Sequence, residues 1–421
     1  MKTLLTIVCA AAVLLGAVVA PGQQAVRAAP AVTILAQSHF VPAFEDELKR
    51  EVRMWSQRRG IAASVDFVST AEMNAKLAAE VETKSGHDIV ALRNYDAALY
   101  QDVLADLTDV ANEVGSAYGG WIDLGKEISV FGGQWKAVPW YHQSFVAVYR
   151  TDFFADIGLD RRKVHEMTWD QLLVAARALA EKRHPVGFPI SQTNDSDLIL
   201  YPLLWAFGAS TVDKAGRVII NSPQTIRAVE FVKQLAQHMP KDVLGWDDSG
   251  NNRFVLSGVG SLTFNPPSIY AVALKENPPL ALALDHAPVP AGPAGRFRST
   301  GTYAFGIWKF KQSPEAKDLI RFLLQRDNYR AQVASSEGYN QPFLKDYRSF
   351  PLWRARTALN AYEPVPEQLH LQGWPGPASA AAQRAWSLHI VPVMFAKAVA
   401  GVPTLEAVRW AEDQLKQLYG R

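Results

Sequence analysis

Aromatic and amide side chains are the groups of this chain best suited to non-covalent contact with another molecule. Its 421 residues include 12 tryptophans, 13 tyrosines and 19 phenylalanines. So many tryptophans require either a large core or a ligand with flat apolar faces, because each ring buries a wide apolar surface. Which of these two uses applies depends on the elements that carry the rings.

Common catalytic motifs do not occur in the sequence. It has no Gly-x-Ser-x-Gly, no Walker-type phosphate loop and no Gly-x-Gly-x-x-Gly after a predicted strand. The triplet Gly258-Val259-Gly260 lacks the third glycine. The 9 histidines are scattered, without His-x-x-x-His spacing. We therefore expect no metal site and no cofactor.

The first 28 residues have the pattern of a secretory signal peptide. Lys2 gives a positive start, residues 4–20 are apolar, and Val26-Arg27-Ala28 is a small-residue cleavage pattern. Gly16 interrupts the apolar stretch and Pro21 ends it, which disfavours a retained membrane anchor. We expect cleavage close to the end of this segment and export to the periplasm.

Removal of residues 1–28 would change the composition in two ways. Cys9, the only cysteine, would leave, so the mature chain would have neither a disulfide nor thiol chemistry. Lys2 and Arg27 would leave too, and 41 basic and 41 acidic residues would remain. A formally neutral chain has no dominant basic surface, so nucleic acid is not an expected partner.

Two lobes are the default expectation for a chain of this length, and residues 132–159 predict the passage between them. Pro139 biases the residue before it to an extended backbone, ahead of the pair Trp140-Tyr141. The continuous apolar run 145–149 is typical of a strand buried on both faces. We interpret this stretch as a crossing, with residues 140–144 facing the cleft between lobes. A buried aromatic strand inside one domain is the alternative.

The N-terminal half of the chain alternates strands and helices. Three strands are predicted, at residues 32–36, 64–68 and 88–92. Ser69 and Glu72 form a capping box at the start of one intervening helix. This order implies a parallel sheet with right-handed crossovers. Because ligands bind beyond the carboxyl ends of such strands, we expect residues 37–39 and 93–96 to lie near one another.

Several sequence segments occur in an order that is typical of one protein family. The strongest is VPWYHQSFVAVYRTDFFADIGL at residues 138–159, followed by TWDQLLVAARAL at 168–179. GHDIVAL at 86–92, LADLTDV at 104–110 and RFVLSGVGSLTFN at 253–265 accompany them. In this order and spacing the chain resembles the extracellular solute-binding proteins of ABC importers, in the class that takes sugars and oligosaccharides. The likeness covers essentially the whole chain after the signal peptide.

The resemblance implies an α/β, two-lobed periplasmic-binding-protein fold of type II, in which each lobe is a mainly parallel sheet flanked by helices. Three crossings between the lobes would fall near residues 140–144, 264–268 and 311–313. Residues 29–141 with 268–311 would form the N-terminal lobe, and residues 142–267 with 312–421 the C-terminal lobe. The lobes would close on a ligand by a hinge motion.

A sugar site needs aromatic faces for C–H surfaces and amides for hydroxyl groups. The resemblance places Trp140, Tyr141 and Gln143 at the first crossing, and Trp246 and Tyr303 in loops that face the cleft. Each of these aromatic residues could equally belong to the core. Gln143 stands where maltose- and trehalose-type relatives often carry an acidic residue, so specificity for those disaccharides does not carry over.

Polar residues at strand ends and crossings complete the predicted ligand contacts, which are His39, Asn94, Tyr95 and Asn265. Asn265 precedes two prolines, and turn formation alone would explain it as well. Asn194 and Asp195 belong to the polar segment SQTNDSD and could reach the cleft, but a solvated loop is the favoured interpretation.

The sequence therefore predicts a non-catalytic, periplasmic carbohydrate-binding component of an ABC importer. Its partners would be a small carbohydrate and the permease subunits in the membrane, and we expect a monomer. Two alternatives remain open. Arg93 is compatible with a phosphorylated polyol as ligand, because guanidinium groups bind phosphate. Paired carboxylates from distant loops could also form a glycosidase site, which would make the chain an exported glycan-active enzyme.

Overall fold

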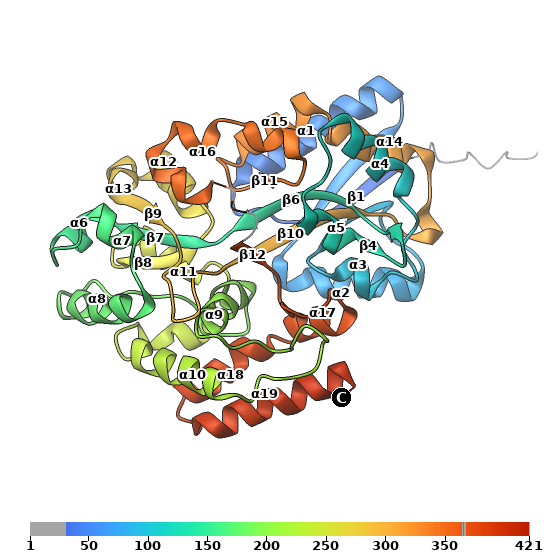
Figure 1. Cartoon of the computed structure of the whole chain (residues 1–421). Helices are drawn as coiled ribbons and strands as arrows, with labels where there is room; N and C mark the ends of the chain where they lie inside the picture. Colours follow the sequence, from blue (N-terminus) through green and yellow to red (C-terminus); the bar gives the residue numbers. More distant parts are fainter. Residues whose placement is uncertain (1–30, 364, 366–367, 421) are drawn as a thin grey trace, which may run out of the picture.

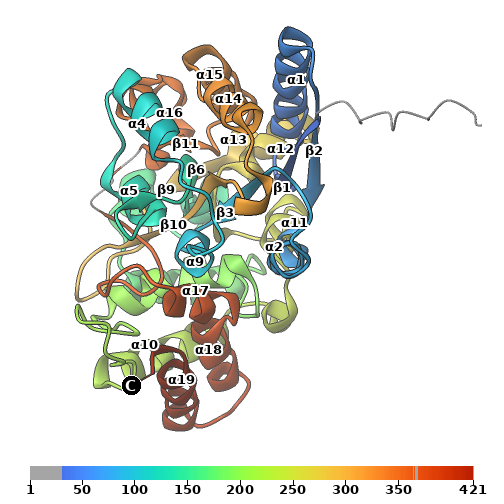
Figure 2. The same ribbon diagram turned by 90° about the vertical axis from the view of Figure 1, so that its right-hand side faces the viewer.

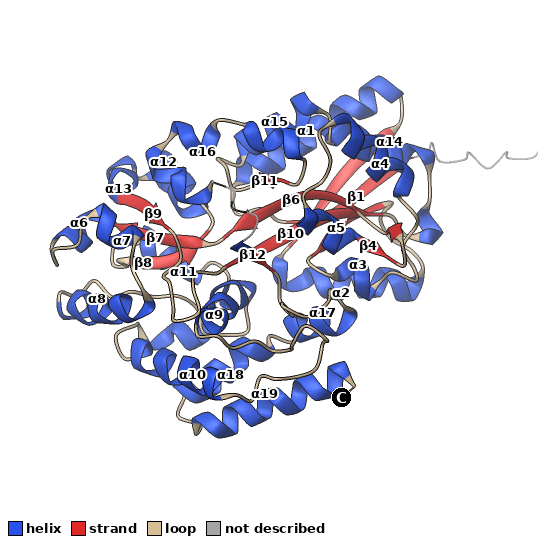
Figure 3. Cartoon of the chain, in the orientation of Figure 1, coloured by secondary structure: helices blue, strands red, loops and turns tan. Residues whose placement is uncertain are grey.

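The computed structural model describes residues 31–363, 365 and 368–420, so the predicted signal peptide lies outside the described residues. A row of strands runs through the middle of the molecule, with helices on both sides of it (Figure 1 and Figure 3). In the described ranges, no helix combines the length and the apolar character that crossing a bilayer requires.

The described residues form two main sheets and one short two-stranded sheet, and the larger main sheet holds seven strands. They are β1 (Ala31–Gln37), β2 (Ala62–Val68), β3 (Ile89–Arg93), β6 (Val138–Ser144), β10 (Arg298–Gly306), β11 (Gln341–Pro342) and β12 (Leu369–His370). β1 pairs parallel with β2 and β3, whereas β10 pairs antiparallel with β3 and β6. The three predicted N-terminal strands are confirmed, but the sheet they join is mixed rather than mainly parallel.

The smaller sheet has the order β8 (Leu262–Asn265), β7 (Val146–Arg150), β9 (Leu284–Ala287). β7 pairs antiparallel with both neighbours, which differs from the mainly parallel sheet expected for the second lobe. The chain path explains the difference. Phe145 alone separates β6 from β7, so the direction of β7 is set by the strand before it and not by a helical crossover.

The helices that accompany the larger sheet come from the N-terminal part and the C-terminal part of the chain. They are α1 (Pro42–Arg59), α2 (Thr70–Thr83), α3 (Asp96–Leu99), α4 (Thr108–Ala117), α5 (Asp123–Ser129), α14 (Pro314–Leu323), α15 (Arg326–Ser335), α16 (Leu352–Ala355) and α17 (Ala380–Ser387). Short 3-10 helices are η2 (Lys309–Lys311), η3 (Lys345–Ser349) and η4 (Thr357–Tyr362), and β4 (Val130–Phe131) pairs with β5 (Gln134–Trp135). The predicted capping box of Ser69 and Glu72 opens α2.

Helices that accompany the smaller sheet lie on the left side and along the bottom of the molecule in Figure 1, with the red C-terminal ones also at the bottom of Figure 2. They are α6 (Thr151–Ala155), α7 (Arg161–His165), α8 (Trp169–Glu181), α9 (Asn194–Ala206), α10 (Pro223–Ala236), η1 (Lys241–Gly245), α11 (Gly250–Leu256), α12 (Ser268–Glu276), α13 (Pro278–Ala283), α18 (Ile390–Val399) and α19 (Thr404–Tyr419). Thr168 and Gln171 form a capping box on α8, where their side chains satisfy backbone N–H groups of the first turn.

The buried apolar side chains separate into two clusters, one around each sheet. The cluster of the larger sheet includes Ile34, Val90 and Phe305, and that of the smaller sheet includes Trp169 and Phe395. Each cluster supplies its own lobe with the apolar burial that stabilises a folded unit. The molecule therefore has the two-lobed α/β architecture.

The chain passes between the two sheets three times within its described part. The first passage is at Phe145, the second lies between β9 and β10, and the third lies between β12 and α18. The first adjoins the predicted crossing, whereas the other two differ from the predicted positions near residues 264–268 and 311–313. Pro267 directly precedes α12, and Pro314 is the first residue of α14, a position that suits proline.

Side-chain contacts show why the clusters divide the chain differently from the expected boundaries. On α14, Asp318 accepts a 2.8 Å hydrogen bond from the indole N–H of Trp55 and forms a 2.8 Å ion pair with Arg59, both on α1. On the other side, Asp285 of β9 pairs with Arg161 of α7 at 2.7 Å. The segment around α14 thus packs with the larger sheet, and β9 packs with the smaller one.

Candidate functional site

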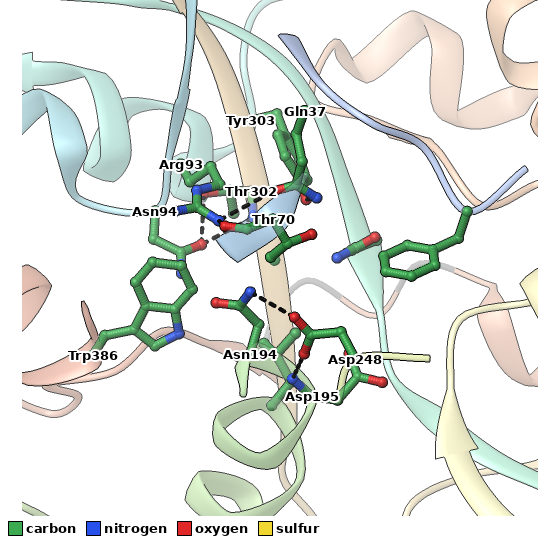
Figure 4. Close-up of a pocket in the computed structure, with 14 residues that line it drawn as sticks. Gln37, Thr70, Arg93, Asn94, Asn194, Asp195, Asp248, Thr302, Tyr303 and Trp386 are labelled. Carbon is green, nitrogen blue, oxygen red and sulfur yellow. Dashed lines mark hydrogen bonds between the residues drawn. The ribbon is translucent and has the colours of Figure 1, made fainter. Parts of the chain in front are cut away.

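One pocket is lined by residues from both sides of the molecule (Figure 4). The side of the larger sheet contributes Gln37, Phe40, Thr70, Arg93, Asn94, Gln143, Gly301, Thr302 and Tyr303, and the other side contributes Asn194, Asp195, Leu198 and Asp248, with Trp386 of α17 between them. The space that these residues enclose, counting the part open to solvent, is about 360 Å³.

Strand ends supply the first wall of this pocket. Gln37 ends β1 and Arg93 ends β3, and because the two strands run parallel, both side chains emerge at the same edge. Arg93 Nη1 donates to Gln37 Oε1 at 3.1 Å, and Gln37 Nε2 donates to the Tyr303 hydroxyl at 3.0 Å. The predicted proximity of residues 37–39 and 93–96 is confirmed for this pair.

The guanidinium group of Arg93 is held by neutral oxygens. Besides Gln37, it donates to the Thr70 carbonyl at 3.4 Å and to Asn74 Oδ1. Its carbon lies 5.0 Å from the ring centroid of Trp386, a cation–π contact. The side chain is 3% exposed, and its Nε has no hydrogen-bond partner within the described part of the chain. Its positive charge is thus placed at the pocket without a carboxylate in direct contact.

The first turn of α9 supplies the opposite wall. Asp248, in the loop before α11, accepts from the Asp195 backbone N–H at 3.0 Å and from Asn194 Nδ2 at 3.2 Å. Asn251 Nδ2 donates to Asp195 Oδ2 at 2.8 Å. Burial, together with the nearby Asp248, holds the pKa of Asp195 well above its usual value, and burial also raises the pKa of Asp248. The wall therefore carries two carboxyl groups that are costly to ionise.

The position of Asn194 and Asp195 corrects the solvated-loop interpretation. Thr193 caps α9 through its side chain, so the helix begins at Asn194 and its first turn faces the pocket. Asp195 is 6% exposed. The polar composition of the segment suggested solvent, but this segment provides the polar lining of a cleft.

Three of the predicted contact residues line the pocket: Asn94, Gln143 and Tyr303. The Asn94 side chain is already engaged, because its Oδ1 accepts from the Thr302 backbone N–H at 3.0 Å. Gln143 is 6% exposed, and its Oε1 has no hydrogen-bond partner within the described ranges. Burial raises the pKa of Tyr303 to about 12, so its hydroxyl stays protonated and can donate. Direct ligand contact by these residues stays a prediction.

Two predicted aromatic contacts at the first crossing pack away from the pocket lining. Trp140 stacks on Phe305 with ring centroids 4.3 Å apart and donates its indole N–H to Gln332 at 2.8 Å. Tyr141 stacks on Tyr303 at 4.5 Å, behind the pocket face. Both side chains belong to the core cluster of the larger sheet. Their arrangement favours the core alternative that the sequence left open.

Tyr95 and His39 also lie outside the pocket lining. The Tyr95 hydroxyl donates to Glu127, and its ring is in the core. His39 lies between Phe44 and Tyr339, with centroid distances of 4.4 and 4.5 Å. Burial lowers the pKa of His39 to about 4, so the imidazole is neutral at pH 7.

The last two predicted contacts, Trp246 and Asn265, have structural partners in the second lobe. Trp246 packs on Phe254 at 5.1 Å and belongs to the core of the smaller sheet. Asn265 Nδ2 donates to Ser268 Oγ at 2.8 Å and to Asn252 Oδ1 at 3.1 Å. These bonds hold the start of α12, in agreement with the turn role considered for Asn265.

Sequence reasoning missed Trp386, Asp248, Thr70, Phe40 and Leu198. Trp386 lies on α17, and its position beside Arg93 has no local signal in the sequence. Asp248 lies in a turn-rich loop, where an acidic residue is ordinarily exposed. No cluster of three or more His, Cys, Asp or Glu suited to a metal ion occurs within the residues that the structure describes.

Two lobes with a polar and aromatic pocket between them define a solute-binding protein. The chain belongs to the family of bacterial extracellular solute-binding proteins, whose family model matches residues 38–329. A relative from Deinococcus radiodurans, named "Probable ABC transporter-binding protein", is 28% identical over 237 residues. That match covers 53% of this chain and 55% of the relative, so the chain spans about half the length of that protein.

Other relatives extend over more of the chain. YcjN of Escherichia coli strain K12, described as an ABC transporter periplasmic-binding protein, is 21% identical over 308 residues, covering 72% of this chain and 68% of YcjN. T. maritima MalE3, solved with maltose bound, superposes with a TM-score of 0.80 at 22% identity, over 93% of this chain and 100% of MalE3. An Arthrobacter chlorophenolicus sugar transporter with bound laminaribiose gives a TM-score of 0.80 at 16% identity, over 92% of this chain and 99% of its own. These likenesses establish the fold.

Proposed function

We propose that this protein binds a carbohydrate in the pocket between its lobes and delivers it to the membrane permease of an ABC importer. The observation that carries the proposal is the lining of the pocket: aromatic rings of Tyr303 and Trp386 stand beside amide groups from both sides. Rings match the C–H faces of a sugar and amides match its hydroxyls. The ligands seen in MalE3 and in the laminaribiose complex support the same substrate class.

Capture proceeds by closure of two rigid bodies. We assign residues 31–144 with 298–371 to one body and residues 147–297 with 390–420 to the other, following the two core clusters, with α17 between the two bodies. A ligand that touches both walls favours the closed state over the open one, because only the closed state offers both sets of contacts. Closure then presents the permease with a surface that the open protein lacks.

The proposed setting follows from the family and the N-terminal pattern. The protein is exported through residues 1–28, works in the periplasm as a monomer, and releases its ligand unchanged. The glycan-active alternative predicts new, shorter products after incubation with an oligosaccharide, whereas a binding protein returns all of the ligand. Chromatography of the recovered ligand separates the two.

A thermal-shift screen tests the proposal. The purified mature protein is heated with mono- to tetrasaccharides, polyols and sugar phosphates, and hits are titrated by calorimetry. A ligand at a hundredfold excess over its Kd adds about 2.7 kcal/mol to the free energy of unfolding. Small-angle scattering should show a smaller radius of gyration for the complex. Absence of any shift with neutral or charged sugars and polyols would contradict the proposal.

The phosphorylated-polyol alternative is less well matched by the pocket. The Nη1 and Nη2 donors of Arg93 already bond to Gln37, Thr70 and Asn74. Asp195 and Asp248 form the facing wall, and an anionic ligand there would raise the cost of ionising these carboxyl groups further. Sugar phosphates are therefore expected to bind more weakly than the parent sugars.

A further inference from the structure

The charged groups of the pocket do not balance one another. The neighbouring carboxylate Asp197, also on α9, has an ionisable basic partner, with His389 Nδ1 2.6 Å from its Oδ2. Asp195 and Asp248 differ, because the donors that reach them are neutral, namely Asn251, Asn194 and a backbone N–H. Two carboxyl groups thus face one guanidinium, that of Arg93, across the pocket.

A second observation points to a ligand rich in hydrogen-bond donors. Gln143, from β6, lines the same pocket and is 6% exposed, and its Oε1 has no hydrogen-bond partner in the described part of the chain. A buried acceptor without a donor destabilises the protein, because it has lost its hydrogen bond to water. The pocket therefore holds three acceptor groups, Asp195, Asp248 and Gln143, that a ligand with several N–H or O–H groups would satisfy.

We propose that the ligand is a polyhydroxylated molecule carrying a protonated amine, an amino sugar, whose ammonium group binds between Asp195 and Asp248. An ammonium group offers three donors, no acceptor and a positive charge, so it satisfies acceptors and offsets the surplus carboxylate in one step. The hydroxyl groups face Arg93, Gln37 and Tyr303 on the opposite wall. The inference rests on the proposed carbohydrate function and specifies its ligand class.

Both carboxyl groups also stand at the first turn of α9, where negative charge is favourable without any ligand. This structural role predicts no preference among ligands. The experiment must therefore compare ligands on the same protein, so that any effect on the helix cancels.

The test uses sugars that differ only at one substituent. Mature protein is titrated by calorimetry with D-glucosamine, D-glucose and N-acetyl-D-glucosamine, and with the corresponding β-1,4-linked disaccharides and trisaccharides. We expect the amine to bind at least about tenfold more tightly than its hydroxyl and acetylated analogues, because a charged hydrogen bond contributes about 1.5–3 kcal/mol and tenfold is about 1.4 kcal/mol. The preference should shrink as salt is raised.

Two single-residue variants test whether the preference for the amine arises at Asp248. Asp248→Asn should reduce amine binding to the level of the neutral analogues. Asp247→Asn is the matched control, because it removes the same charge from an adjacent, exposed residue that pairs with Arg253 at 2.8 Å; it should keep the preference. Neutral analogues that bind as tightly as the amines, or a preference retained in Asp248→Asn, would overturn the inference and leave carbohydrate binding intact. No binding by any sugar would instead refute the proposed function.

Discussion

The guanidinium carbon of Arg93 lies 5.0 Å from the ring centroid of Trp386, so the end of β3 meets a helix from the last part of the chain at the pocket. α17 is fixed there by Gln383, whose Nε2 donates to Asp96 Oδ1 at 2.6 Å. Because Trp386 packs against Arg93 on one side and lines the pocket, it couples the C-terminal segment to the first wall of the site.

Replacement of Trp386 should weaken ligand binding more than replacement of a core tryptophan. Trp386→Leu removes a ring face and a cation–π contact, which together contribute roughly 1–2 kcal/mol, so we expect about a tenfold rise in Kd by calorimetry. The control is Trp246→Leu, since Trp246 packs on Phe254 outside the pocket. The control should unfold at a lower temperature yet bind with unchanged affinity. Equal losses of affinity in both variants would contradict this assignment.

Gly301 should be required for ligand binding because it leaves room for Gln143. A Cβ at position 301 would lie 2.7 Å from Gln143 Nε2, so the Gly301→Ala variant must displace that amide. We expect a threefold to tenfold loss of affinity, roughly 0.5–1.5 kcal/mol for one hydrogen bond. Gly245→Ala is the control, because nothing lies within 4 Å of a Cβ there. If Gly301→Ala costs as much in a Gln143→Ala background, the effect does not act through Gln143.

Glu51 should make the folded state less stable as pH rises. This α1 residue is 0% exposed, and burial raises its pKa from 4.5 to about 9. It keeps its proton in the folded state at pH 7, while the unfolded chain releases it, so stability falls between pH 4.5 and 9. Glu51→Gln retains an oxygen for Gln332 Nε2, which donates to Glu51 at 2.7 Å. Urea unfolding should show the variant gaining about 3 kcal/mol on the natural protein from pH 4.5 to 7; a pH-independent difference would refute this.

His142 should make the folded state less stable as pH falls, the opposite pH dependence to that of Glu51. Its side chain is 0% exposed, and burial lowers its pKa from 6.5 to about 3. The unfolded chain takes up a proton below pH 6.5 and the folded protein does not, so stability falls as pH falls toward 3. At pH 5 this one residue accounts for about 2 kcal/mol. His142→Gln should lose less stability between pH 7 and 5, and parallel pH curves for the two proteins would exclude this role.

Local sequence patterns were sufficient to predict many of the strands and helix starts of the first lobe. The strands that became β1, β2 and β3, and the capping boxes at Ser69 and Thr168, follow from periodicity and cap chemistry, which act over a few residues. The position of Arg93 at a ligand-facing edge also followed, because parallel strands end together. Family motifs then gave the two-lobed fold.

Tertiary packing decided which aromatic and acidic side chains lie in the core and which line the pocket. Trp140 and Trp386 are both aromatic and both stand near polar neighbours in sequence, yet Trp140 is stacked on Phe305 in a core and Trp386 lines the pocket. No local pattern separates them, because the partner of each ring comes from a distant part of the chain. The same holds for Asp195 and Asp248, which belong to one wall only because the loop before α11 packs on the first turn of α9. The sequence by itself determined the N-terminal strands, their helix caps and the family, whereas long-range contacts decided which side chains lie in the core and which line the pocket.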